Sequence, residues 1–406
     1  MASAFSVSII LGRIIGPEGL GVINLANRLV GFFLIISMLG MDSVIRKETA
    51  IAYNRKEWST IANVIFTSLR INIPIALALS VCLIYFSPWL AETIFNDPKL
   101  TTPLKVFSAL LIAQILSRIF SAGINGFRKI WQSNLASNTL SSVLIATGLL
   151  VTSINDININ LFNVVIIYGL SRFAVTLVLG FYWHHLFSFK GKKIMQTKSM
   201  LKVALPLLLV SSTNLIAANA DVYMLGWLRN SVEVGLYSVA SRLGLLTNFF
   251  LAISISALSP KIASLYADGK TREIEKMIQQ ITKGLFILGL TSILFYTFFG
   301  KFILSFWGNQ FIESYWVLGI ITVGQFFNIS TGSTGVFLMM TGHEKLLGRI
   351  TLLSVIVNIT INLFLIPLYG AVGAAIATTT TVTFENLIKV IMVKKKENIL
   401  TIPFVN

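Results

Sequence analysis

Seven ionisable residues interrupt long apolar stretches of this 406-residue sequence. A charged side chain inside hydrocarbon costs about 2.5 to 3.5 kcal/mol on insertion scales, so each of the seven needs a functional or structural reason. Five are arginines, whose guanidinium groups stay charged and present paired donors that match phosphate oxygens. They are Arg28, Arg70, Arg118, Arg172 and Arg242. The sequence therefore favours an anionic, phosphate-bearing ligand.

Some of these arginines have a simpler explanation. Arg28 and Arg242 lie about two turns from the ends of their predicted helices that face away from the cytoplasm. Arg118 lies about two turns from the cytoplasmic end of its helix. Basic side chains in such places can extend to the head-group region, a behaviour called snorkelling. For Arg70 and Arg172, which lie nearest to mid-helix, we favour the lining of an internal cavity. We favour the same role for Arg28 and Arg242, while Arg118 stays open between the two interpretations.

Two acidic residues in apolar stretches are candidates to bind a coupling cation, either Na+ or H+. Asp221 lies well inside the seventh stretch, with Asn214 and Asn219 on neighbouring turns, and a salt bridge to an arginine is the alternative. Glu385 precedes Lys389 by four residues, a spacing that favours a local ion pair on one helix face. No other cofactor is expected.

The elements that carry these residues are predicted to be membrane-spanning helices. Hydrophobic residues make up 55% of the sequence and charged residues only 12%, whereas a soluble domain has about 25% charged residues. Apolar stretches of about 20 residues recur, which is long enough for a helix to cross a hydrocarbon core of about 30 Å. The stretches do not alternate as barrel strands do. We predict an all-α integral membrane protein with about twelve transmembrane helices.

The predicted segments are Ala2–Leu11, Leu20–Met41, Ile61–Leu90, Leu104–Ile124, Leu135–Ile154, Ile159–His184, Val203–Leu228, Leu236–Pro260, Ile281–Trp307, Tyr315–Met340, Leu346–Leu368 and Ala371–Met392. The first covers only about 15 Å at helical rise and is too short to span alone. Either this helix is partial or an N-terminal portion is missing from the sequence, and we expect the second.

The distribution of Lys and Arg predicts the orientation. Basic residues gather in alternate loops such as Arg46–Lys56 and Lys394–Lys396, whereas loops such as Ser153–Asn160 and Gly308–Ser314 have none. Short cytoplasmic loops carry the excess of basic residues in membrane proteins. Both termini are therefore predicted to be cytoplasmic.

The chain repeats itself at a constant spacing of 214 residues. Leu11, Gly12, Gly21, Ala26, Arg28 and Leu29 recur as Leu225, Gly226, Gly235, Ala240, Arg242 and Leu243. An even number of segments in each half makes the repeats parallel, related by an axis along the membrane normal. We expect two pseudo-symmetric six-helix lobes, residues 1–189 and 203–406, with a basic cytoplasmic linker at 190–202 and a central cavity between the lobes.

Signatures of enzymes and metal sites are absent from the sequence. It has no Gly-x-x-x-x-Gly-Lys-Ser/Thr loop that would hold ATP phosphates. The three histidines, His184, His185 and His343, have no partners at metal-ligand spacing. The net charge of +16 comes from short clusters between apolar stretches, which indicates membrane topology rather than nucleic acid binding. We expect neither an enzyme nor a nucleic-acid partner.

Four short segments carry a family resemblance: Leu11–Gly21, Leu39–Arg46, Asp221–Leu243 and Leu365–Ala375. In this order, at these helices, they resemble the bacterial polysaccharide flippases, also called O-antigen or capsule repeat-unit transporters. That family lies within the multidrug, oligosaccharidyl-lipid and polysaccharide exporter superfamily. The resemblance covers essentially the whole chain. At its start the sequence departs from the family pattern, because the usual basic N-terminus and full first helix are missing.

The resemblance implies a two-lobed transporter in the bacterial cell membrane, the inner membrane of a Gram-negative host. It implies translocation of undecaprenyl-pyrophosphate-linked oligosaccharides to the outer leaflet by alternating access. Membrane lipids, a polysaccharide polymerase and the chain-length machinery are implied partners.

Two alternatives stay open. A cation-coupled multidrug exporter of the same superfamily would favour acids over arginines in its cavity. A membrane glycosyltransferase or polymerase would need a large loop or soluble face for catalysis, and the longest interhelical segment, Lys261–Gln280, is short.

Overall fold

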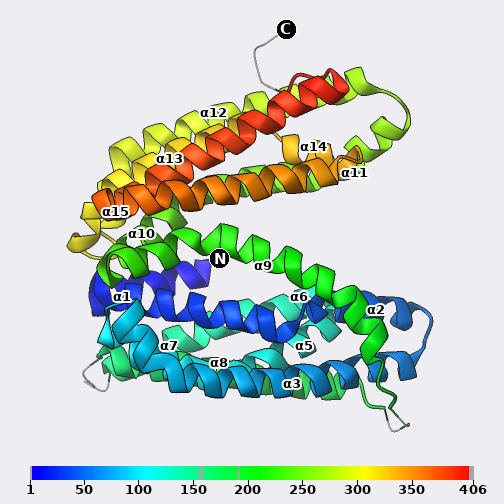
Figure 1. Ribbon diagram of the computed structural model, residues 1–406, viewed down its shortest axis with the longest axis vertical. Coiled ribbons are helices and arrows are strands. Elements are labelled where there is room, and N and C mark those ends of the chain that lie inside the picture. Colours follow the sequence, from blue (N-terminus) through cyan, green and yellow to red (C-terminus); the bar gives the residue numbers. More distant parts are fainter. Residues whose placement is uncertain (1, 155–158, 190, 192, 402–406) are drawn as a thin grey trace. The chain divides into compact units, whose positions relative to one another are not determined.

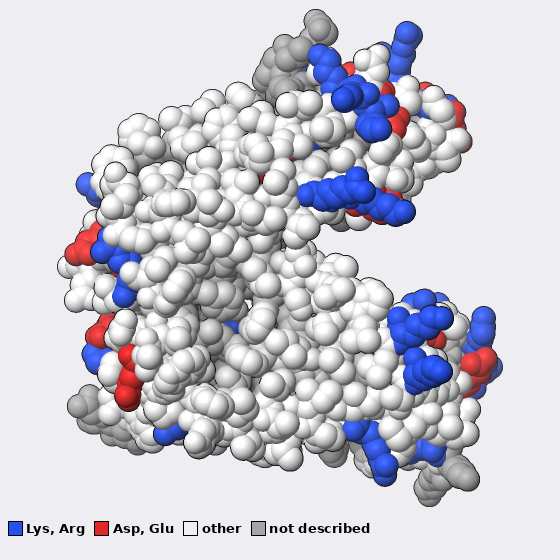
Figure 2. Space-filling model, in the orientation of Figure 1, with Lys and Arg blue, Asp and Glu red and all other residues white. Residues whose placement is uncertain are grey.

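The computed structural model describes residues 2–154, 159–189, 191 and 193–401. Within these ranges every regular element is a helix (Figure 1). On the face that Figure 2 shows, the charged side chains of each part of the chain gather toward the helix ends, and the surface between them is almost free of charge. This pattern matches helices whose middle stretches lie in hydrocarbon.

The chain forms two compact units, Met1–Asn219 and Ala220–Asn406. Helix α9 (Thr197–Leu228) contributes to both. The division expected from the loops, 1–189 and 203–406 around a linker at 190–202, remains a prediction, and Lys190 and Lys192 of that linker lie outside the described residues.

Unit 1 begins with α1 (Ala2–Met38), which is two helices joined at Gly16. Gly16 has a φ of 66°, a conformation that glycine adopts without the steric cost of a side chain. Pro17 then opens the second part, where a missing N–H costs nothing. The helices that follow α1 and precede α9 are α2 (Met41–Asn54), α3 (Trp58–Trp89), the π-helix η1 (Leu90–Ile94), the 3-10 helix η2 (Pro98–Leu100), α4 (Thr101–Ala109), α5 (Leu111–Gly126), α6 (Ile130–Asn134), the π-helix η3 (Leu135–Leu140), α7 (Ser141–Ile154) and α8 (Leu161–Leu186).

Unit 2 ends with the longest helix, α15 (Glu344–Glu397), which is broken at Gly370 with a φ of 55°. The other helices of unit 2 after α9 are α10 (Ser231–Gly244), α11 (Asn248–Ala267), α12 (Thr271–Leu304), the 3-10 helix η5 (Asn309–Ser314), α13 (Tyr315–Ser330) and α14 (Thr334–Met340).

Described helices cover most of each of the twelve predicted segments. By length and composition, eight described helices can cross a membrane, or nine if the pair Pro98–Ala109 and Leu111–Gly126, bent by 46°, forms one span. This number is lower than twelve partly because α1 and α15 each join two predicted segments across a glycine. The predicted segment at Tyr315–Met340 is interrupted between α13 and α14.

The helix boundaries confirm the internal repeat. The spacing of 214 residues separates the start of α4 at Thr101 from the start of α13 at Tyr315. It also separates the end of α5 at Gly126 from the end of α14 at Met340. Two residues later in each unit the backbone turns through positive φ, 61° at Arg128 and 79° at Gly342.

Two stretches predicted as loops between membrane-spanning segments are mostly helical. Helix α2 packs against α3 and α5 and buries Met41, Val44 and Ile45, which recur at helical spacing. Helices α11 and α12 extend through most of Lys261–Gln280, because Ile262, Ile274 and Ile278 are fully buried in one apolar cluster. Packing of an amphipathic face stabilised helices that hydropathy alone does not reveal.

Candidate functional site

Arg172 of α8 is held at the centre of a polar cluster inside unit 1. Its Nη1 donates to Oε1 of Gln114 on α5, and its Nη2 donates to Oδ1 of Asn27 on α1, both at 2.8 Å. The guanidinium carbon lies 5.5 Å from the ring centroid of Phe107 on α4. Four helices thus converge on one cation, and both hydrogen-bond acceptors are uncharged amides.

Arg28 follows Asn27 directly on α1, so its backbone lies beside this cluster. Its Nη1 donates to Oδ1 of Asn219, close to the point where α9 leaves unit 1. Both arginine side chains are half-buried. The hydrogen-bond partners of the two guanidinium groups therefore come from α1, α5 and α9.

Arg118 stands one helical turn after Gln114 on α5 and is exposed. It lies within electrostatic range of Arg172 and of Asp42 at the start of α2. The buried Nε2 of Gln114 has no hydrogen-bond acceptor in the part of the chain that the structure describes. The cluster thus presents cationic groups and an unused amide donor, which is a combination that suits phosphate oxygens.

The remaining two arginines do not join this cluster. Arg70 of α3 is exposed, and its guanidinium lies 5.2 Å from the ring centroid of Phe66, which also has the ammonium of Lys193 at 6.0 Å. Arg242 lies half-buried in the last turn of α10, in unit 2. The five arginines that the sequence singled out are thus three residues of unit 1 on α1, α5 and α8, one surface residue of α3 and one residue of the other unit.

Asp221 forms the centre of a second polar site, in unit 2. Its Oδ2 accepts hydrogen bonds of 2.6 Å from the hydroxyls of Tyr237 on α10 and Thr378 on α15. Its Oδ1 accepts one of 2.7 Å from Nδ2 of Asn362, on the other half of α15. These partners are neutral, so the contacts described for Asp221 do not include the arginine salt bridge that was the alternative expectation.

Further oxygen atoms surround this carboxylate. Nδ2 of Asn362 also donates to Oδ1 of Asn358 at 3.0 Å. Asn362 is fully buried, and its own Oδ1 receives no hydrogen bond from any described residue. Carboxylate, amide and hydroxyl oxygens are the ligands that hard cations prefer. The arrangement can therefore hold a small cation without any histidine or cysteine.

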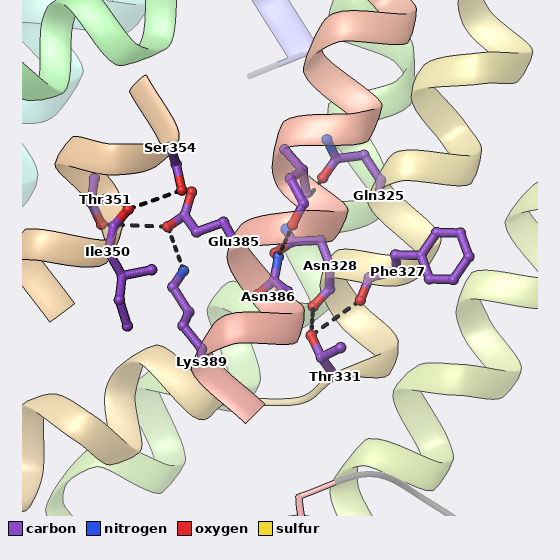
Figure 3. Close-up of polar contacts among 11 residues, drawn as sticks. Gln325, Phe327, Asn328, Thr331, Ile350, Thr351, Ser354, Glu385, Asn386 and Lys389 are labelled. Atoms are coloured by element: carbon purple, nitrogen blue, oxygen red, sulfur yellow. Dashed lines mark hydrogen bonds and ion pairs between the residues drawn. The ribbon is translucent and has the colours of Figure 1, made fainter. Parts of the chain in front are cut away.

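Glu385 forms the ion pair that its spacing predicts. Its Oε1 lies 2.6 Å from Nζ of Lys389 on the same helix half and accepts a hydrogen bond of 3.4 Å from Thr351 on the other half of α15. Figure 3 shows this pair beside a separate amide ladder, in which Asn386 of α15 donates to Asn328 of α13 at 3.0 Å. Both features join helices within unit 2.

Sequence reasoning missed the partners that hold these charges. Asn27, Gln114, Tyr237 and Thr378 were not singled out, although each is a polar residue in an apolar stretch. The position of Asn27 directly before Arg28 in an apolar stretch could have identified Asn27 as a candidate site residue. The convergence of the four residues on two sites depends on contacts between distant helices.

Two family models match the sequence. The model described as "Polysaccharide biosynthesis protein" matches residues 2–266, and the MatE model matches residues 206–364. Over 191 residues the chain is 25% identical to the capsular polysaccharide biosynthesis protein CapF of Staphylococcus aureus, covering 47% of this chain and 48% of CapF. Over 164 residues it is 26% identical to the probable low-salt glycan biosynthesis flippase Agl15 of Haloferax volcanii, covering 39% and 34%. The matches thus span less than half of each relative.

Two solved structures share the fold. An inward-facing multidrug resistance MATE family transporter of the MOP superfamily aligns with a TM-score of 0.79 at 14% identity, over 98% of this chain and 94% of that one. The lipid II flippase MurJ in an inward closed conformation aligns with a TM-score of 0.78 at 17% identity, over 97% and 85%. The fold is therefore the all-α, two-lobed transporter fold. Because its model matches well over half of the sequence, the chain belongs to the polysaccharide biosynthesis protein family.

Proposed function

We propose that this protein is a flippase that carries undecaprenyl-pyrophosphate-linked oligosaccharide repeat units from the cytoplasmic to the outer leaflet of the bacterial cell membrane. Family membership and the similarity to CapF and Agl15 support this substrate class. The observation that carries the proposal is the guanidinium of Arg172, held by two neutral amides inside unit 1.

Neutral amides orient a guanidinium group without cancelling its charge. An arginine held by a carboxylate would have to break that ion pair before it could bind phosphate, at a cost that grows in a low-dielectric interior. Arg172 needs only to exchange amide oxygens for phosphate oxygens. Together with Arg28 and Arg118, it offers a diphosphate head group a polar route past the hydrocarbon.

The site around Asp221 in unit 2 is where, in this proposal, the cation that drives transport binds. We propose that Asp221 binds the coupling cation, Na+ or H+, and that transport proceeds by alternating access between the lobes. The oxygen-rich surroundings of Asp221 support Na+, and its lack of a described arginine partner leaves its charge available. Glu385 is the second candidate, although its ion pair with Lys389 already satisfies its charge.

The protein acts in this proposal as a transporter and not as an enzyme. It lies in the cell membrane with both termini in the cytoplasm, and the polymerase and chain-length machinery take over its product on the outer side. A glycosyltransferase role is disfavoured because the longest segment expected between helices is itself mostly helical.

The test is accumulation of the lipid-linked repeat unit in the cytoplasmic leaflet after deletion of the gene, with rescue by variants at equal membrane expression. Wild type should restore transport, whereas Arg172→Gln should lower its rate by about 10-fold to 100-fold, the loss expected for hydrogen bonds to a charged group. Arg28→Ala combined with Arg242→Ala tests the repeat-related pair. Lys105→Gln is the control, because it removes an exposed positive charge from α4 of the same unit.

Two results would contradict the proposal. If deletion causes no accumulation but makes cells sensitive to cationic drugs, the exporter alternative is correct and the arginines are structural. If Arg172→Gln and Lys105→Gln rescue equally, the arginine cluster does not contact the head group.

A further inference from the structure

An apolar groove runs along the outer surface of unit 1, between the segment that joins α6 to η3 and the second half of α8. Its volume is about 490 Å³, which lies within the range of about 300 to 1,000 Å³ typical of small-molecule sites. The groove is lined by Trp131, Gln132, Leu135, Ala136, Leu177, Val178, Phe181 and Tyr182. All of these residues belong to one unit and to two neighbouring segments.

Two of the aromatic residues that line this groove are strongly exposed. Trp131 is 72% exposed and Phe181 is 79% exposed. The lining also includes the small residue Ala136 and the exposed aliphatic residues Leu135 and Leu177. Leu135 and Ala136 open the π-helix η3, a rare distortion that is frequently found at functional sites.

The groove lies at a defined depth along α8. This helix ends at Leu186, so Tyr182 stands about 6 Å and Leu177 about 14 Å before its end at 1.5 Å per residue. The groove therefore covers the outer part of one leaflet, next to the head-group region. The basic residues of the loops predict that this end of α8 faces the cytoplasm.

Positive charge stands at the head-group end of the groove. The ammonium of Lys129 lies 5.8 Å from the ring centroid of Tyr182, which lines the groove. Arg128 precedes it, exposed and oriented by a hydrogen bond of 2.9 Å from Nη2 to Oδ1 of Asn54. An apolar channel with one ammonium group against its lining, and a second basic residue next to that lysine in the sequence, is complementary to a lipid with an anionic head.

We propose that this groove binds the head-proximal isoprene units of the lipid carrier in the cytoplasmic leaflet, with the carrier's diphosphate at Lys129 and Arg128. The inference rests on the proposed flippase function and adds to it a docking site for the carrier outside the arginine cluster. Burial from lipid gains no hydrophobic free energy, so affinity must come from shape and charge. A branched isoprenyl chain is expected to fit a groove lined by aromatic and aliphatic side chains, and its double bonds leave it less conformational freedom to lose than a straight saturated acyl chain has.

The experiment uses the full chain in nanodiscs of neutral phospholipid with a photoactivatable isoprenyl diphosphate that carries no sugar. Labelled peptides are identified by mass spectrometry, and unlabelled isoprenyl diphosphate is added as competitor. We expect competed labelling within residues 131–136 and 177–182. Ala136→Phe fills the groove and should reduce this labelling at least tenfold. Val143→Phe, on the exposed face of α7, should leave it unchanged.

A comparison of charged and uncharged competitors tests whether the groove recognises the negative charge of the head group. Lys129→Gln should weaken competition by the diphosphate about fivefold, the effect of about 1 kcal/mol per basic residue near a membrane surface. Competition by uncharged isoprenol should not change in this variant.

Each of the following outcomes would overturn the inference. Equal competition by phosphatidylglycerol would mean that the groove holds ordinary anionic lipid. Photo-cross-links between two chains through residues 131–136 would identify an interface between copies. Labelling that is spread over α7 and α8 and is not reduced by unlabelled isoprenyl diphosphate would show that the groove is not a specific binding site. If wild type transports lipid-linked oligosaccharide but the groove is not labelled, only this inference fails; if transport is absent as well, the proposed function fails.

Discussion

The carboxylate of Glu233 accepts a hydrogen bond of 2.8 Å from the backbone N–H of Ala371, the first residue after the break in α15. Four residues before Glu233, Nε of Arg229 donates to the carbonyl oxygen of Ile366, 3.0 Å away, just before the break. The corner between α9 and α10 therefore satisfies backbone groups on both sides of Gly370. An acid at a helix start and a cation at a helix end also complement the helix dipoles.

Loss of the Glu233 carboxylate should destabilise unit 2. Glu233→Ala leaves the N–H of Ala371 without its acceptor and should lower the free energy of unfolding by about 1 to 2 kcal/mol, as for the loss of other helix caps. Glu233→Gln keeps an acceptor oxygen and should cost less. Thermal unfolding in detergent measures both, and equal losses for the two variants would show that the hydrogen bond at Ala371 does not matter.

Gly370→Ala should be more harmful than an ordinary glycine substitution. The φ of 55° strains any residue with a side chain, and a Cβ would lie 2.6 Å from Oε1 of Glu233. A loss of about 2 kcal/mol or more is expected from strain and displacement of the cap. Gly348→Ala is the matched control on the same helix, since nothing lies within 4 Å of a Cβ there.

That control should be neutral or stabilising by up to about 1 kcal/mol, because alanine favours a helix interior more than glycine does. Similar unfolding temperatures for Gly370→Ala and Gly348→Ala would contradict the strained break.

Part of the basic linker is fastened to α3. The N–H of Ile194 donates to Oδ1 of Asn63 at 2.7 Å, and the N–H of Gln196 donates to Oγ1 of Thr67 at 3.0 Å. Asn63→Ala should raise the hydrogen-exchange rate of the Ile194 amide about tenfold, the effect of losing about 1.4 kcal/mol of protection. Ser59→Ala, on an exposed part of α3, should not. Unchanged exchange in Asn63→Ala would show that other contacts hold the linker.

Cation binding at Asp221 should be visible without transport. If Na+ binds the folded state, replacing choline chloride by NaCl should raise the unfolding temperature, because a ligand at 100 times its Kd stabilises by about 2.7 kcal/mol. Asp221→Asn keeps the size of the side chain and should abolish this shift. Glu385→Gln, which alters the other candidate acid, should retain it if Asp221 is the binding site. A sodium shift that survives in Asp221→Asn and disappears in Glu385→Gln would reverse the assignment.

The order and class of the helices follow from the sequence, because spanning a membrane requires long uninterrupted apolar stretches. The repeat was visible for a related reason. Leu11 and Leu225, or Arg28 and Arg242, keep equal spacing in two halves that fold alike. Mean hydropathy did not predict helix α2 or the extensions of α11 and α12. Each has only one apolar face, and the charged residues on its other face lower the mean hydropathy of the stretch.

What the sequence determined by itself is thus the membrane class, the order of the apolar segments, the repeat and the chemical character of the charges within those segments. Only the tertiary structure decided which charges meet. Arg172 and Asn27 are 145 positions apart, and Asp221 and Thr378 are 157 apart. Hydropathy and spacing report the local environment of each residue, whereas a hydrogen bond between helices depends on how their faces pack. For that reason Arg172 is distinguished from Arg70 by its partners and not by its place in an apolar stretch.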